Sequence, residues 1–429
     1  MPRRLRPRLR LSSLVVMLVA ACSDPTGTVS IVTGEETDVF SRQPAPTTLV
    51  TELVALDGTK KELSRQTLPV ASVDLGNLQQ SDIGGVAVTG LGPDGKALVK
   101  GQTLLVQWGA LRESQLLLFA QRTGELARVP SGPAAADVGP GVMVEGRFVF
   151  GVHGSTAYLY DLLTLHTLTG APALPRAPKS VASLSSAALL IDDNGATSFD
   201  LQNGGAVDFP APANGTFAEV ASGARVGATD SSQFIVGATR IGNGGASARI
   251  LLIDANGKAS FAALTTPREG ACAAYVEGRG LVVYGGDAKG PGGEVLAPNA
   301  TVATPLPYPP DAVKGCAATA LDQTHVLVAG GDGGPARVLD LTCASNCTPA
   351  VWQGAIPLTR AEAADLAPDA ALVVGDDAQG ATHAYRASPA ELKEIPLKTA
   401  RRGARLVRAP TDALLVVGGG AAGIEMYRE

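Results

Sequence analysis

Four cysteines in the C-terminal half are the residues with the clearest potential for covalent chemistry. Cys343 and Cys347 flank three residues that read as a loop, so their spacing predicts a disulfide across a small hairpin. Cys272 and Cys316 stand 44 residues apart, and both a disulfide and a pair of buried thiols fit their surroundings. A zinc site fits poorly, because no histidine lies close to either pair.

Groups suited to acid–base or metal chemistry are sparse. None of the four histidines stands at a metal-ligand spacing: His153, His166, His325 and His383. The chain has no G-x-S-x-G nucleophile elbow, no H-E-x-x-H pair and no phosphate-binding G-x-x-x-x-G-K-[ST] loop. The sequence therefore predicts no catalytic residue, no cofactor and no metal ligand.

Acidic residues recur directly behind short apolar segments, at Asp287, Asp332 and Asp376. Two interpretations are open. If the fold gathers these carboxylates on one face, they could bind Ca²⁺, a cationic ligand or a sugar, since hard cations need several oxygen ligands together. In the other interpretation each carboxylate accepts hydrogen bonds within its own tight turn. The turn interpretation is the favoured one.

The first 22 residues have the order of a secretory signal. Five arginines precede the short apolar segment 14–19, which cannot span a bilayer. Two alanines then precede Cys22, and this ending resembles the bacterial lipobox. The resemblance implies cleavage before Cys22, a diacylglycerol thioether on its sulfur and an acylated N-terminus; an ordinary cleaved signal is the alternative. We expect a lipoprotein signal peptide at 1–21 and a lipid anchor in the bacterial cell envelope, at the outer membrane or cell surface rather than the inner membrane.

Charge and composition bound the partners of the mature chain. Without residues 1–21, which hold five arginines and no acidic residue, 30 basic and 40 acidic side chains remain. This negative balance argues against a nucleic-acid partner, which requires a basic surface. Residues 22–45 are rich in Thr, Gly, Pro and acidic residues, and predict a flexible tether. Only 4% of the chain is aromatic, so the core of the predicted domain at 46–429 should be aliphatic.

The chain repeats itself with a period of about 45 residues. Apolar segments that end in paired glycines occur at 281–286, 326–331 and 414–419, and weaker copies extend upstream to about residue 80. Within each period, short apolar runs are separated by Gly, Asn, Asp and Pro at intervals of about 8–12 residues, which is typical of antiparallel strands. Four short strands per period predict the blades of an all-β propeller.

These repeats resemble the kelch family of β-propellers over roughly residues 260–429. The resemblance rests on paired glycines, on an aromatic residue in the next strand and on a basic residue at the start of each unit: Gly285, Gly286, Gly330, Gly331, Gly418 and Gly419; Tyr385 and Tyr427; Arg268, Lys314, Arg360 and Arg402. The chain departs from the family in lacking the usual tryptophan near the end of each repeat, where only Trp352 is found. Glycine suits these positions because it adopts positive φ and allows close approach of strands.

The number of apolar–glycine segments allows seven or eight blades. The last unit stops at its third strand, residues 423–427, whereas residues 51–63 resemble a third and fourth strand. We therefore expect this N-terminal segment to complete the last blade and close the ring, which would remove exposed strand edges.

The favoured function is that of a non-catalytic, monomeric scaffold, held on a membrane by its lipid and binding a protein or a glycan through the propeller loops. The alternative is a propeller enzyme, such as a lyase, glycosidase or oxidase, with its site over the central channel. The scarcity of histidines and the lack of a Tyr and His copper-ligand set disfavour this alternative. A passive coat protein is a third possibility.

Overall fold

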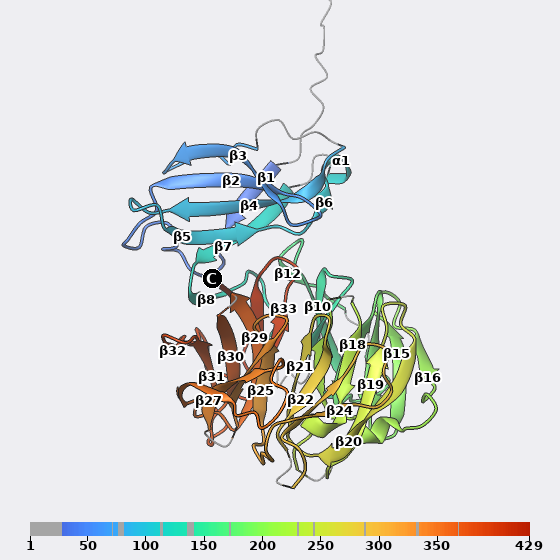
Figure 1. Cartoon of the computed structure of the whole chain (residues 1–429). Coiled ribbons are helices and arrows are strands. Elements are labelled where there is room, and N and C mark those ends of the chain that lie inside the picture. Colours follow the sequence, from blue (N-terminus) through green and yellow to red (C-terminus); the bar gives the residue numbers. More distant parts are fainter. Residues whose placement is uncertain are drawn as a thin grey trace, which may run out of the picture.

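The computed structural model describes residues 28–429 apart from residues 71, 76–80, 112–114, 135–140, 171–172, 230, 243–244, 287–288, 332–333 and 368. The chain forms two units, an N-terminal β-sheet at 28–122 and a β-propeller at 125–429 (Figure 1). Over the described ranges, no helix has the length and apolar character needed to cross a bilayer.

The N-terminal sheet contains seven strands in the order β1-β7-β5-β4-β2-β3, with β6 paired to β4. The pairing of β1 with β7 is parallel, whereas β2 pairs antiparallel with β3 and β4. Buried aliphatic side chains pack around Trp108 in its core. Its elements are β1 (Thr28–Val32), β2 (Thr48–Val54), β3 (Lys60–Thr67), β4 (Ile83–Leu91), β5 (Ala97–Gln102), β6 (Val106–Gln107), α1 (Trp108–Leu111) and β7 (Gln115–Arg122).

The predicted propeller is confirmed, and it has seven four-stranded blades. Blades 1 to 3 contain β9 (Gly141–Val144), β10 (Phe148–His153), β11 (Thr156–Asp161) and β12 (His166–Thr167); β13 (Ser180–Leu184), β14 (Ala187–Asp192), β15 (Gly195–Asp200) and β16 (Ala206–Phe209); and β17 (Ala224–Gly227), β18 (Gln233–Val236), β19 (Ser247–Ile253) and β20 (Ala259–Arg268). Short 3₁₀ turns lie at Phe217–Glu219 and Gly237–Thr239.

Blades 4 to 7 follow the same plan. They contain β21 (Cys272–Val276), β22 (Gly280–Tyr284), β23 (Gly293–Leu296) and β24 (Thr304–Leu306); β25 (Cys316–Ala320), β26 (His325–Gly330), β27 (Pro335–Asp340) and β28 (Ala350–Ala355); β29 (Arg360–Ala367), β30 (Ala370–Asp376), β31 (Thr382–Ala387) and β32 (Leu392–Glu394); and β33 (Arg405–Arg408), β34 (Leu414–Val417), β35 (Glu425–Arg428) and β8 (Glu125–Arg128). Neighbouring blades share apolar clusters built mainly from Val, Leu, Ile and Ala.

Three expectations about the N-terminal part are wrong. Residues 28–32 form β1 rather than part of a tether through residue 45, and Val39 is buried. The propeller begins at 125 and not at 46, because residues 46–122 form the separate sheet. Residues 51–63 lie in β2 and β3 of that sheet, so they do not complete the last blade. Its fourth strand is β8, which pairs with β35. Alternating strands look alike in sequence whichever sheet they join.

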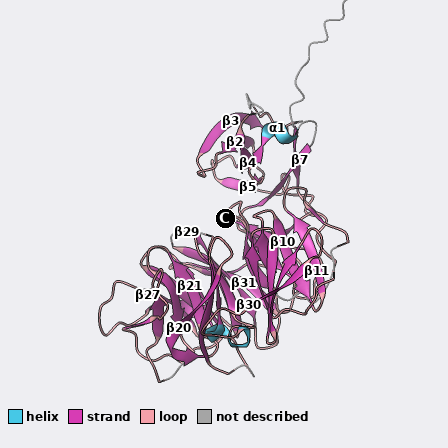
Figure 2. Cartoon of the chain, turned by 90° about the vertical axis from the view of Figure 1, so that its right-hand side faces the viewer, coloured by secondary structure: helices cyan, strands magenta, loops and turns pink. Residues whose placement is uncertain are grey.

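The N-terminal sheet docks on the propeller at the seam between blades 7 and 1 (Figures 1 and 2). Only two residues separate β7 from β8, and Phe119 of β7 packs in one cluster with Tyr160 of blade 1 and Val407 of blade 7. The Gln121 side-chain amide donates to the Met426 carbonyl at 2.9 Å. A shared apolar cluster and hydrogen bonds therefore hold the two units together.

The paired glycines turn the chain at the end of the second strand in blades 4, 5 and 7. All six have positive φ, from 68° to 84°: Gly285, Gly286, Gly330, Gly331, Gly418 and Gly419. At Gly331 a Cβ would stand 2.6 Å from the Lys314 carbonyl oxygen. Both the backbone conformation and this close approach therefore require glycine.

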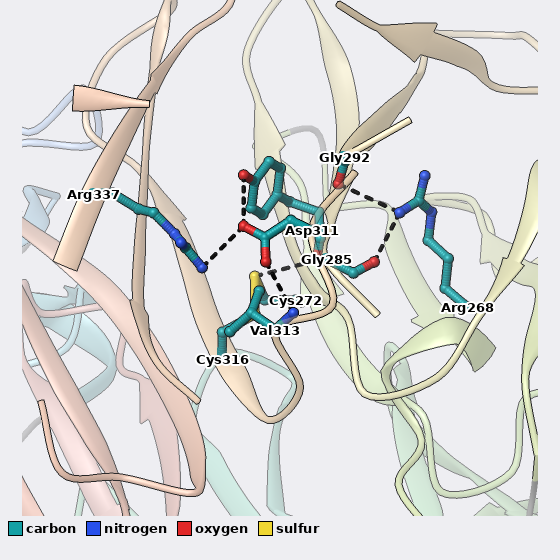
Figure 3. Close-up of a disulfide and its surroundings, with 9 residues drawn as sticks. Arg268, Cys272, Gly285, Gly292, Asp311, Val313, Cys316 and Arg337 are labelled. Atoms are coloured by element: carbon teal, nitrogen blue, oxygen red, sulfur yellow. Dashed lines mark hydrogen bonds and ion pairs between the residues drawn. A yellow bond between two sulfur atoms is a disulfide. The ribbon is translucent and has the colours of Figure 1, made fainter. Parts of the chain in front are cut away.

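Both cysteine pairs form disulfides. Cys343 and Cys347 have a Cα separation of 6.0 Å, within the range of an unforced bridge. Cys272 and Cys316 join the first strands of blades 4 and 5, with a Cα separation of 5.3 Å. Figure 3 shows this second disulfide beside the ion pair between Arg337 and Asp311. The alternative of two buried thiols at 272 and 316 is therefore wrong.

Two basic residues at unit starts make equivalent buried ion pairs. Arg268 pairs with Glu294, both fully buried, and donates to the Gly285 carbonyl at 2.8 Å. In blade 7 Arg401, not its exposed neighbour Arg402, pairs with Glu425 and donates to the Gly418 carbonyl at 2.7 Å. The guanidinium thus satisfies carbonyls that the glycine turn exposes, and the carboxylate neutralises its charge.

Candidate binding cleft

The first strands of the blades surround the central channel, and hydrogen bonds join neighbouring blades along it. At one end of these strands, backbone bonds link blades 3 to 6 in succession. Gly270 N donates to Arg240 O (2.6 Å), Gly315 N to Gly270 O (2.7 Å) and Ala361 N to Gly315 O (2.9 Å). The disulfide between Cys272 and Cys316 adds a covalent link on this side of the ring. Blades 3 to 6 are therefore tightly fastened around the channel.

A cleft of about 390 Å³ opens at the other end of the first strands, where blades 1, 2 and 3 meet. It lies on the face where the first and second strands of each blade are joined, which is also the face that carries the N-terminal sheet. The lining consists mainly of turn residues: Met143, Glu145, Gly146, Ser183, Leu184, Ser185, Arg225, Gly227, Ala228, Ser231, Ser232, Gln233, Asp254, Ala255 and Gly257.

Tight turns hold the rim of the cleft. Glu145, Ser185 and Ser231 stand at the turn tips with φ of 55°, 63° and 69°. Glu145 N donates to Ser185 O at 3.1 Å, which joins the turns of blades 1 and 2. The Gln233 side chain bridges blades 2 and 3, because its amide accepts from Ser183 N at 3.1 Å and donates to Ser183 O at 3.0 Å. The rim is thus fixed by bonds between blades.

Arg225 on β17, the first strand of blade 3, lines this cleft. Burial lowers the pKa of its guanidinium, while the charge of Glu362 on β29 of blade 6 acts in the opposite direction. Glu362 itself accepts from Arg405 Nη1 at 2.7 Å and from Leu406 N at 2.8 Å. Burial raises the pKa of Glu362, and Arg360 and Arg225 oppose that rise.

The predicted carboxylate ring is only partly within the described residues. Asp287 and Asp332 lie outside them. Asp376 is buried, where its carboxylate accepts from Thr382 Oγ1 (2.7 Å) and Gly403 N (2.9 Å) and so joins blades 6 and 7. Over the part of the chain that is described, no cluster of three or more His, Cys, Asp or Glu side chains could hold a metal ion. The Asp376 carboxylate therefore joins two blades through its hydrogen bonds.

Turn chemistry is directly visible at the neighbouring Asp377. Its carboxylate accepts from Gln379 N at 2.9 Å and from Ala381 N at 2.8 Å. It also contacts His383, whose other ring nitrogen lies 2.9 Å from Glu394. Hydrogen bonds to Glu394 and Asp377 raise the pKa of His383. This histidine belongs to a partly exposed ion-pair group on blade 6, away from the cleft.

The cleft can bind a polar ligand through several kinds of group. Four serine hydroxyls donate and accept hydrogen bonds, and the Arg225 guanidinium can bind a carboxylate. Sequence reasoning did not single out the cleft, because the repeats before residue 260 are the least regular. A signal was present in Arg225, a charged residue within a first strand, but only the arrangement of three blades makes it part of a site.

No protein-family model and no curated protein matches the chain. Among solved structures, it is similar to a chain in the crystal structure of the mitotic checkpoint complex, with 11% identity over 72% of this chain and 92% of that one and a TM-score of 0.46. The Swd1 β-propeller domain of Myceliophteria thermophila has 11% identity over 71% and 99% of the two chains, with a TM-score of 0.41. The extracellular domain of a putative hybrid two component system from B. thetaiotaomicron has 11% identity over 71% and 40%, with a TM-score of 0.42. These identities are too low to transfer a function to this chain.

Proposed function

We propose that this chain is a non-catalytic scaffold lipoprotein of a bacterial cell envelope, whose kelch-like propeller binds a partner protein at the cleft of blades 1 to 3. The lipobox-like ending at Cys22 supports the anchor. The bonded turns around the cleft support binding, because a rim that is already ordered loses little conformational entropy when a partner docks. The chain acts as a monomer.

The observation that carries this proposal is the composition of the cleft. Its lining combines serine hydroxyls, an amide, the Arg225 guanidinium and the carboxylates of Glu145 and Asp254, on turns fixed by blade-to-blade bonds. Such a surface recognises a complementary polar surface by hydrogen bonding and charge. Loops on a rigid scaffold are the usual carriers of recognition.

The partner is tested by photo-crosslinking in intact cells. A photoreactive amino acid replaces Ser185 on the rim, and a matched control replaces Asp208, whose exposed side chain lies on the outer strand β16. We expect a saturable protein adduct from position 185 that position 208 does not give. Equal adducts from both positions, or none from position 185, would contradict binding at the cleft.

Two further measurements test the rest of the proposal. Cys22→Ala should abolish incorporation of labelled palmitate and move the protein from the membrane fraction to the soluble fraction; unchanged labelling would refute the anchor. The purified protein should show no turnover of glycan, ester or alcohol substrates above background. Turnover that is lost on substitution of a residue in the cleft or the channel would instead support an enzyme.

A further inference from the structure

An arginine without a partner faces the proposed binding cleft. Among the described residues the Arg225 side chain makes no hydrogen bond or ion pair, and Glu362 is the carboxylate whose charge acts on it. Its side chain is only partly exposed, so water does not fully solvate the guanidinium. A partly buried guanidinium with five unused donors favours binding of an anion.

Glu362, the carboxylate whose charge acts on Arg225, already accepts hydrogen bonds on both of its oxygens. Glu362 is bound on one oxygen by Arg405 and on the other by the amide of Leu406. A second arginine, Arg360, also acts on Glu362. Asp376 is close enough to influence this group but is bound by its own blade contacts.

Two other carboxylates, Glu145 and Asp254, line the cleft itself. Asp254 accepts from Asn256 N and Lys258 N within its own turn, and Glu145 stands exposed at the rim. Among the described residues, the Arg225 guanidinium therefore keeps its donors free.

The surroundings of Arg225 leave its guanidinium open to the cleft. Gly227 stands two residues along β17, and a Cβ there would lie 4.0 Å from Arg225 Nη1. No side chain at 227 covers the guanidinium. Ser183, Ser185 and Ser231 line the same cleft and contribute hydroxyls to it. A carboxylate that enters can therefore pair with the guanidinium and accept hydrogen bonds from hydroxyls.

We propose that Arg225 in the lining of the cleft pairs with a carboxylate of an acidic peptide segment in the partner protein. This inference rests on the proposed function and adds the chemistry of the ligand. A peptide fits better than an acidic sugar because the described lining has no aromatic side chain, whose flat apolar face would hold a sugar ring. The exposed turns at Glu145, Ser185 and Ser231 leave room for the flanking residues of such a segment.

The probe is a random dodecapeptide library displayed on phage and selected on the full-length protein in detergent. Selected peptides are then synthesised, and their affinities are measured by fluorescence anisotropy for the wild type and four variants. Arg225→Gln removes the charge and Arg225→Lys retains it. Gly227→Leu covers the guanidinium without removing it. Arg402→Gln removes an exposed arginine from another part of the propeller as the matched control. Equal thermal unfolding midpoints confirm that the variants fold.

We expect acidic peptides whose affinity falls at least about 10-fold in Arg225→Gln and in Gly227→Leu, less in Arg225→Lys, and not in Arg402→Gln. Replacement of the peptide carboxylates by amides should give the same loss. The inference would be overturned if the selected peptides are neutral and their affinity falls in Gly227→Leu but not in Arg225→Gln. Binding of polygalacturonate that depends on Arg225, without any acidic peptide, would also overturn it. Neither result changes the outcome of photo-crosslinking at position 185, which tests the proposed function independently.

Discussion

The two disulfides should differ in what they contribute to stability, because they close loops of very different length. Cys272 and Cys316 are 44 residues apart in sequence and join two blades, whereas Cys343 and Cys347 are 4 apart within one hairpin. The perturbation is removal of each bridge in turn, as the paired variants Cys272→Ala with Cys316→Ala and Cys343→Ala with Cys347→Ala.

The expected magnitudes follow from the entropy that each bridge removes from the unfolded chain. Loop closure gives about 4 kcal/mol for the bridge between blades 4 and 5 and about 2 kcal/mol for the hairpin bridge. Cys272 and Cys316 are also buried, with 2% and 5% of their surface exposed, so loss of their sulfur contacts adds to the first figure. Removal of the bridge between blades should therefore cost the protein about 2 kcal/mol more.

The assay is reversible guanidinium unfolding of the purified protein, followed by near-UV circular dichroism and tryptophan fluorescence, with oxidised and reduced wild type as references. Coincident transitions from the two probes establish two-state behaviour. Equal m-values in both variants confirm that the same surface is exposed on unfolding. An equal loss in both variants, or a larger loss from the hairpin variant, would refute the loop-closure reasoning.

Three further outcomes are expected from the same unfolding measurements. Glu294→Gln should cost about 3–5 kcal/mol because it leaves a fully buried guanidinium without its counter-charge, whereas Glu62→Gln, in an exposed pair, should cost at most about 1 kcal/mol; similar losses would argue against the buried pair. Gly331→Ala combines a positive φ with a Cβ 2.6 Å from a carbonyl oxygen, and should cost more than the roughly 1–2 kcal/mol expected for Gly380→Ala, where φ is positive but no atom lies within 4 Å; equal costs would exclude the close approach. The raised pKa of His383 means that its contribution is present below the unfolded pKa of about 6.5 and is lost as the pH rises through the higher folded pKa, so the difference in unfolding free energy between wild type and His383→Gln should shrink above that pH; a difference that grows instead would contradict the assignment.

The propeller could be predicted from the sequence because each repeat contains residues that determine the local backbone conformation. Paired glycines such as Gly330 and Gly331 require positive φ, so they mark the end of a strand wherever they occur. The disulfide between Cys343 and Cys347 was predictable for a similar reason, since a separation of 4 residues leaves few other geometries. The disulfide at Cys272 depended on the repeat, which places both cysteines at the start of a first strand.

The N-terminal sheet was not predictable from the same kind of signal. Polar and apolar residues alternate in 51–63 as in a pair of strands, but this pattern does not determine which sheet the strands join. The choice is made by packing. Phe119 fits the cluster between blades 7 and 1, and β8 directly after it reaches β35. A pairing between strands about 300 residues apart depends on these contacts rather than on any local residue type.

The sequence by itself determined an all-β repeat with glycine turns, and it supplied the lipobox-like segment that suggests an anchor. The tertiary structure decided the blade number, the strand that completes blade 7 and the cleft lined by Arg225 and Gly227. The physical reason is range. Backbone conformation at a turn depends on a few neighbouring residues, whereas an unpaired guanidinium beside an open cleft depends on which blades meet and which carboxylates are already bound.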